Sequence, residues 1–210
     1  LRGSIPDWMS IVLSNTLVIS GALLGYLGLE RYTGKRSAQV HNYILIAVFP
    51  VVHAYFTFIH PSLAVRNLNV SLGLFIIVFQ SMALMIFRVE PVMRRFTFGV
   101  GLVFTGYCLI SVARVVGFFL NPQINVDYFQ SGPFEGFVQI VYQTLFILLT
   151  YSLILMFNKR LVAEVQTQEE KFSKAFQSSP YAILLSRLSD GRIIELNEGF
   201  VQLSGYDYKE

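Results

Sequence analysis

The sequence has few charged residues and almost no cysteine. Only 14% of its 210 residues are charged, whereas a soluble domain carries about 25%. The one cysteine, Cys108, cannot form an internal disulfide, and the apolar run around it predicts a buried, inert thiol. No basic stretch is interleaved with aromatic residues, which excludes a nucleic-acid-binding surface.

Catalytic and metal-binding patterns are missing as well. No paired carboxylates, histidine-rich cluster or Ser–His arrangement points to a common site, so we nominate no catalytic residue. His53 and His60 are too few to predict a metal site. The apolar segments contain no carboxylate and only one mid-segment proline, Pro50, which argues against the alternative of a transporter or channel with a regulatory tail.

The apolar residues gather in five long segments. A helix of about 20 apolar residues crosses the hydrocarbon core of a bilayer, and hydrophobic residues make up 54% of this chain. The pattern predicts an all-α polytopic membrane helix bundle over residues 1–157, in which Gly21 and Gly25 allow close approach of another helix. The predicted spans are Trp8–Leu27, Tyr43–Ile59, Leu68–Phe87, Phe96–Leu120 and Phe137–Phe157.

Basic residues in the connections predict the orientation of the spans. Basic clusters follow the first, third and fifth predicted spans, whereas the opposite connections hold only Arg66. Because basic loops stay in the cytoplasm, we expect the first residue to lie outside and the C-terminus inside. The basic clusters are Arg31, Lys35 and Arg36; Arg88, Arg94 and Arg95; and Lys159 and Arg160.

Polar side chains within the spans are the candidate site residues, because they are costly in a bilayer. Counting the helical rise from the outer ends places four of them about 10 Å below the outer surface. A shared cavity open to the outside would follow, with Arg114 binding a small anionic or amphipathic ligand. Snorkelling of Arg114, a hydrogen-bonded neutral histidine and interhelical amide contacts are the alternatives. The candidates are Arg114, His53, Asn15 and Gln143, with Gln139 shallower and Gln80 in the inner half.

A soluble helix follows the last span, over residues 158–175. Its apolar residues recur at alternating spacings of four and three, which is typical of a seam that pairs with a second helix. The seam predicts a homodimer through the helix after Phe157; an amphipathic linker that packs on its own domain is the alternative. The seam residues are Leu161, Val165, Gln168, Phe172 and Ala175.

Residues 176–210 predict a strand, a turn, a second strand and a helix. Ala182–Arg187 and Arg192–Leu196 are the strands, with Ser189–Asp190–Gly191 as the hairpin turn. This stretch resembles the opening of a PAS domain, and Asn197 stands where that family has its usual asparagine. The resemblance leaves the cofactor unknown: the domain could bind haem, flavin or another ligand, or bind nothing and only dimerise and relay. The matching residues are Phe176, Ser178, Ser179, Pro180, Ala182, Ile183, Asp190, Gly191, Arg192, Ile193, Asn197, Phe200, Gly205 and Tyr206.

The membrane half resembles the sensor region of bacterial diguanylate cyclases and sensor histidine kinases. The resemblance rests on residues 6–11 with Asn15, and on Tyr26–Leu29 with Arg31. It implies a signal-transducing sensor in the bacterial inner membrane, a piece of a longer protein whose kinase or cyclase output lies after Glu210. The expected order is therefore a sensor bundle (1–157), a signalling helix (158–175) and the first part of a PAS domain (176–210).

Overall fold

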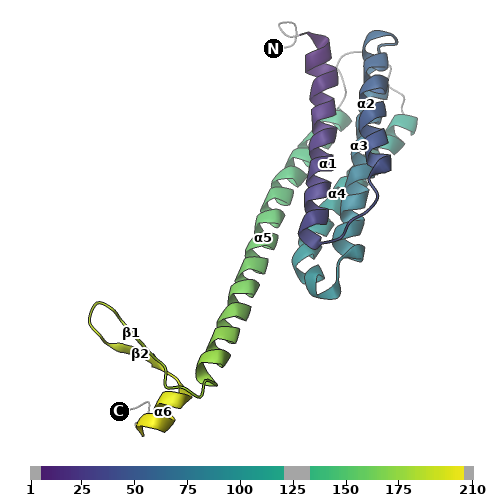
Figure 1. Cartoon of the computed structure of the whole chain (residues 1–210). Helices are drawn as coiled ribbons and strands as arrows, with labels where there is room; N and C mark the ends of the chain where they lie inside the picture. The colour runs from purple at the N-terminus through teal and green to yellow at the C-terminus, as the bar shows by residue number, and fades with distance from the viewer. Residues whose placement is uncertain (1–5, 121–132, 206–210) are drawn as a thin grey trace. The chain divides into compact units, whose positions relative to one another are not determined.

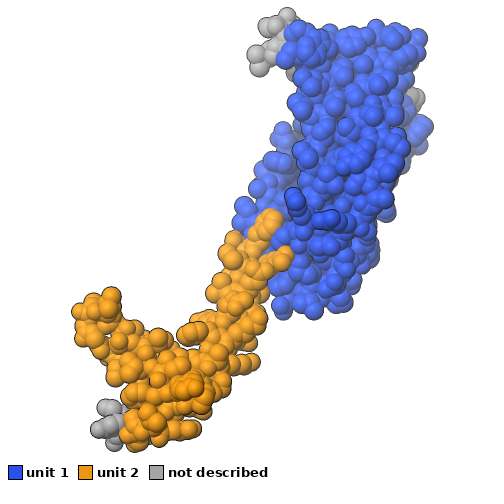
Figure 2. All heavy atoms as spheres, viewed as in Figure 1, with its two compact units in different colours: residues 1–156 blue, residues 157–210 orange. Residues whose placement is uncertain are grey.

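The computed structural model describes residues 6–120 and 133–205. The chain divides into two compact units, Leu1–Met156 and Phe157–Glu210 (Figure 2). One helix, α5 (Pro133–Gln177), begins in the first unit and ends in the second (Figure 1).

The described part of the first unit is entirely helical (Figure 1). Its helices are α1 (Ser14–Thr33), α2 (Val40–Phe58), α3 (Leu63–Ala83), α4 (Pro91–Leu120) and the beginning of α5. Two π-helical segments lengthen them, η1 (Trp8–Leu13) before α1 and η2 (Leu84–Arg88) after α3. Five helical stretches are long and apolar enough to cross a membrane, namely Trp8–Thr33, Val40–Phe58, Leu63–Arg88, Pro91–Leu120 and Gly136–Gln177.

Each predicted span overlaps one of these helices, and all five helical stretches are longer than predicted. Hydropathy marks only the apolar part of a helix, whereas its polar ends keep the same backbone hydrogen bonds. The helix that contains the first span ends at Gly34, whose positive φ of 70° suits the left-handed cap. Pro91, which needs no N–H partner at the first position of a helix, begins α4. Pro50 lies inside α2 without ending it.

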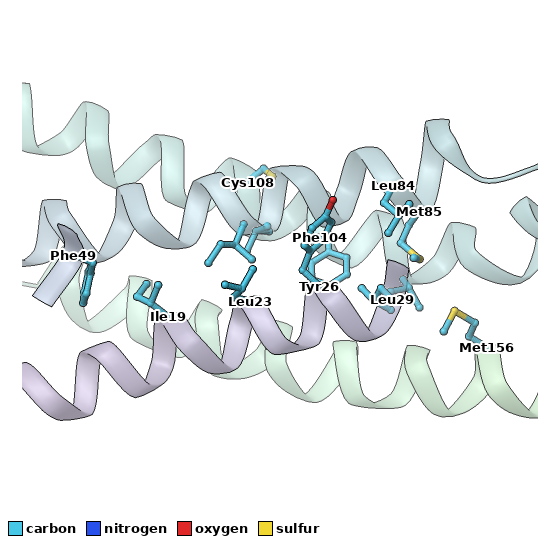
Figure 3. Packing of buried hydrophobic residues seen from close by; sticks show 13 residues of the cluster. Ile19, Leu23, Tyr26, Leu29, Phe49, Leu84, Met85, Phe104, Cys108 and Met156 are labelled. Atoms are coloured by element: carbon cyan, nitrogen blue, oxygen red, sulfur yellow. The ribbon is translucent and has the colours of Figure 1, made fainter. Parts of the chain in front are cut away.

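A hydrophobic core joins the helices of the first unit. Ile19, Tyr26 and Phe49 from α1 and α2 are almost fully buried, and Met156 of α5 belongs to the same cluster (Figure 3). Gly101 lets α4 pack closely against η2. A Cβ atom at Gly101 would come within 2.5 Å of Cγ1 of Ile86.

Among the described residues, no helix makes the close approach predicted at Gly21 and Gly25. Both glycines are exposed, and a Cβ atom at either would have no neighbour within 4 Å. Close contacts occur instead at Gly101 and at Gly106, where a Cβ atom would lie 2.9 Å from Cδ2 of Leu145 in α5. The spacing identified glycines that permit close packing, but the tertiary arrangement decided which of them are used.

The second unit contains the end of α5, a two-stranded antiparallel sheet and a short helix. Strands β1 (Leu184–Ser186) and β2 (Ile193–Leu196) pair Leu184 with Leu196 and have an irregularity after Leu185. Between them, the carboxylate of Asp190 accepts from the amide of Arg192, and Gly191 has a φ of 70°. Helix α6 (Glu198–Ser204) follows directly. The predicted order of strand, turn, strand and helix is therefore present, with shorter strands.

Candidate functional site

Asn197 is the most extensively hydrogen-bonded side chain of the second unit, and it is fully buried. Its Oδ1 atom accepts from the backbone N–H of Ile183 at 2.8 Å and of Phe200 at 3.0 Å. Its Nδ2 atom donates to the carbonyl oxygens of Phe176 at 3.0 Å and Tyr181 at 2.8 Å. One amide therefore links the last turn of α5, the segment before β1 and the first turn of α6.

Local sequence explains why this asparagine occupies that position. Asparagine favours the N-cap, where its oxygen accepts from the amide three residues later, and Asn197 caps α6 in this way. Gly199 makes room for the segment before β1, since a Cβ atom there would lie 2.6 Å from the carbonyl oxygen of Tyr181. Phe176 is buried and stacks on Phe172 with ring centroids 5.9 Å apart. The hydrogen bonds of Asn197 thus hold the end of α5 to the segment before β1.

A second polar cluster lies in the first unit, at the connection between α1 and α2. Glu30 is only 5% exposed. Its Oε1 atom accepts from the hydroxyl groups of Tyr26, at 2.8 Å, and Ser37, and its Oε2 atom accepts from the amide of Gln39 at 2.8 Å. All three partners are neutral, so this carboxylate is buried among uncharged hydrogen-bond donors.

The same network continues into α2 and α3. The side chains of Asn42 and Gln80 exchange two hydrogen bonds, at 2.9 and 3.0 Å, and Asn42 also donates to Oε1 of Gln39 at 2.7 Å. The His41 imidazole donates to Oε1 of Gln80 at 2.9 Å. We call these residues the Glu30 network. It consists of Tyr26, Glu30, Ser37, Gln39, His41, Asn42 and Gln80.

Sequence reasoning missed most of this network. We expected no carboxylate in any span, but the first apolar helical stretch runs to Thr33 and includes Glu30. Hydropathy placed Glu30 outside the span because it is followed by Arg31. The available signal was the spacing of four between Tyr26 and Glu30, which places their side chains on one face of a helix.

The five predicted ligand-binding residues are in different environments. Asn15 donates to the carbonyl of Ile11 in its own helix at 2.7 Å, so its amide is satisfied locally. Gln139 and Gln143 are exposed on α5. Arg114 is half-buried in α4. These environments do not test the shared cavity, and a site that uses all five residues stays a prediction.

His53 is the predicted residue whose surroundings best fit a binding role. It is 2% exposed and stacks on Phe49 with ring centroids 5.3 Å apart. The Asn69 amide lies 3.5 Å from its Nδ1 atom and can donate to it, which leaves the proton on Nε2. Nε2 itself has no hydrogen-bond partner among the described residues. A buried donor of this kind is costly unless a partner binds it.

Comparison with known proteins identifies one part of the chain. Residues 170–210 match a family model described as a PAS domain. This segment contains Asn197 and both strands, and it overlaps the end of α5. No curated protein and no solved structure matches the chain. The match to the PAS model, together with five apolar helices, supports a PAS-containing signalling protein.

Proposed function

We propose that the chain is the sensory half of a transmembrane signalling protein. In this proposal the bundle perceives a stimulus, and α5 relays it through the PAS segment to a C-terminal output, a histidine kinase or a diguanylate cyclase. One observation carries the proposal: α5 is a single helix of 45 residues, whose first part is apolar enough to span a membrane and whose last turn lies in the PAS segment.

Hydrogen bonding supports a stiff connection at the PAS end of this helix. Asn197 binds the carbonyl of Phe176 in the last turn of α5 and the amide of Ile183 ahead of β1. Because these bonds are buried, breaking them costs more than breaking exposed ones. A rotation or shift of α5 therefore displaces the hairpin instead of being absorbed by a loop.

We place the protein in the bacterial inner membrane, with the PAS segment in the cytoplasm. The support is the charge distribution: Lys159 and Arg160 directly follow the apolar part of α5, and Arg94 and Arg95 lie on the same predicted side. His53 and the Glu30 network are then at opposite ends of the bundle. We propose the buried Nε2 atom of His53 as the place where a small ligand binds.

An insertion series in α5 tests the relay. A diguanylate cyclase domain joined after residue 210 serves as reporter, and residues are inserted between Gln166 and Thr167, both exposed. Each inserted residue turns the following helix by about 100°. Two residues rotate the PAS segment by about 200°, whereas seven leave it within about 20° of its original direction.

We expect the two-residue insertion to change cyclic-di-GMP output strongly and the seven-residue insertion to restore it. Matched alanine-rich insertions after residue 210, outside the helix, serve as the control. Output that is independent of the phase of the insertion would contradict a helical relay. Separately, periplasmic labelling of a cysteine placed at Gln166 would contradict the proposed orientation.

A further inference from the structure

One heptad pattern runs along nearly the whole of α5, through its apolar part and its polar part alike. If Leu161 is assigned to position d, every a and d residue from Phe137 to Ala175 is exposed in the single chain. Six of these twelve positions precede Phe157 and six follow it, without a change of phase. The a positions are Phe137, Thr144, Tyr151, Asn158, Val165 and Phe172, and the d positions are Ile140, Ile147, Ile154, Leu161, Gln168 and Ala175.

The bundle packs against a different side of α5. Of the eight buried or half-buried residues between Gly136 and Met156, seven occupy positions b, c or f. Tyr142, at f, bonds the hydroxyl of Ser111 in α4 at 2.9 Å, and Leu145, at b, fills the space beside Gly106. The a and d residues, which we call the α5 seam, therefore remain open while α5 keeps its contacts with its own bundle.

The extent of this open surface is unusual for the bundle. Only 6% of the most apolar window of α5 is buried, compared with 39% for the stretch Leu63–Arg88. Lipid can cover apolar side chains within the bilayer, but it cannot cover Leu161, Val165 and Phe172 beyond the basic pair Lys159–Arg160. These three are 56–60% exposed. A continuous row of large apolar side chains in water marks an interaction surface.

We propose that the α5 seam binds the α5 seam of a second copy of the chain, parallel and in register, through the membrane as well as beyond it. This inference rests on the proposed dimeric signalling helix and extends it into the bilayer. Two copies inserted in the same direction have parallel α5 helices, and a shared heptad phase brings the same face of each helix to the partner along its full length.

The polar residues of the seam support a second copy as the partner. In a parallel, in-register pair each a and d residue meets its own counterpart. Thr144, Asn158 and Gln168 would each pair with an identical side chain, and hydroxyl and amide groups are able both to donate and to accept. Asparagine at an a position also fixes the register of paired helices.

One contact in the proposed pair is unfavourable, and it provides a test of whether the two helices are parallel or antiparallel. In a parallel pair, position g of one helix lies near position e of the next heptad in the partner. Glu164 at g then faces Glu169 at e of the partner, which is a like-charge contact. Glu169→Lys converts it into an attractive pair if the helices are parallel. In an antiparallel pair the same change would place two lysines together.

Cysteine cross-linking of the full chain in native membranes tests the proposal. Cys108 is first replaced by alanine. Single cysteines are then placed at Ile147 and Val165 on the seam, and at their neighbours Phe146 (c) and Gln166 (b) as matched controls. Ile147 and Phe146 are 68% and 65% exposed, so accessibility does not distinguish them.

We expect disulfide cross-linking at Ile147→Cys and Val165→Cys to be about tenfold faster than at the neighbouring controls, because only the seam brings two Cα atoms within about 7 Å. Glu169→Lys should increase cross-linking at Val165→Cys.

If Val165→Cys cross-links but Ile147→Cys reacts no faster than Phe146→Cys, the seam in the bilayer is refuted while the dimeric signalling helix stands. If neither seam position exceeds its control, both fail. Decreased cross-linking with Glu169→Lys would refute the parallel arrangement.

Discussion

Replacement of Asn197 by alanine should uncouple the end of α5 from the hairpin. The substitution removes the oxygen that accepts from Ile183 and Phe200, and the amide that donates to the carbonyls of Phe176 and Tyr181. The site is fully buried, so water replaces these partners only if the local structure opens. The variant therefore tests whether this side chain fixes the arrangement of the second unit.

The cost follows from the bonds that are lost. Loss of an N-cap side chain destabilises a helix by about 1 kcal/mol. The half-buried amide of Ile183, left without an acceptor, adds about 1–3 kcal/mol. The sum of about 3 kcal/mol corresponds to roughly a hundredfold change in the local opening equilibrium, since about 1.4 kcal/mol is a factor of ten.

Hydrogen exchange of the whole chain in lipid nanodiscs measures this change. We expect the protected amides of β1, β2 and the first turn of α6 to exchange about a hundredfold faster in Asn197→Ala, while α3 and α4 exchange as before. Asn197→Asp is the matched variant, because it keeps the acceptor for Phe200 but places a carboxylate against two carbonyl oxygens. In Asn197→Asp we expect the amides of α6 to stay protected from exchange, whereas the bond to the end of α5 is lost. If the hairpin amides of Asn197→Ala exchange as slowly as those of the unsubstituted chain, the reasoning is refuted.

Other substitutions test the remaining contacts. Gly199→Ala should destabilise the second unit as strongly as Asn197→Ala, because the new methyl group would lie 2.6 Å from a backbone carbonyl oxygen; unchanged exchange of the hairpin would contradict this. Glu30→Ala leaves three donors without their acceptor and should lower the thermal unfolding temperature in detergent, with exposed Glu90→Ala as control. Gln80→Leu, which breaks the paired amide contact to α2, should act through the same network, so that the two losses in the double variant with Glu30→Ala are not additive. Gly101→Leu, which disturbs the contact between α4 and η2, should lower the fraction of chain that stays folded after mild heating more than Gly21→Leu does.

The sequence alone determined the elements of this protein. About 20 consecutive apolar residues have no stable alternative to a helix in a bilayer, so the five apolar helices of the described residues were predictable, although their ends were not. The hairpin was predictable for a similarly local reason, since Asp190 and Gly191 suit a tight turn. Asn197 was recognised from its place after the second predicted strand, and its cap on α6 is a contact within three residues.

Only the tertiary structure decided which residues meet across the chain. Glu30 looked like part of a connection, but the α1–α2 turn folds Ser37 and Gln39 over it and buries it. Asn42 and Gln80 are 38 positions apart, and helical periodicity cannot predict a contact between residues of two different helices. Gly101 and Gly106, which lie at close helix contacts, were likewise indistinguishable from Gly21 by spacing alone. Periodicity specifies which residues share a face of one helix, whereas the facing element is chosen by the packing of all the helices together.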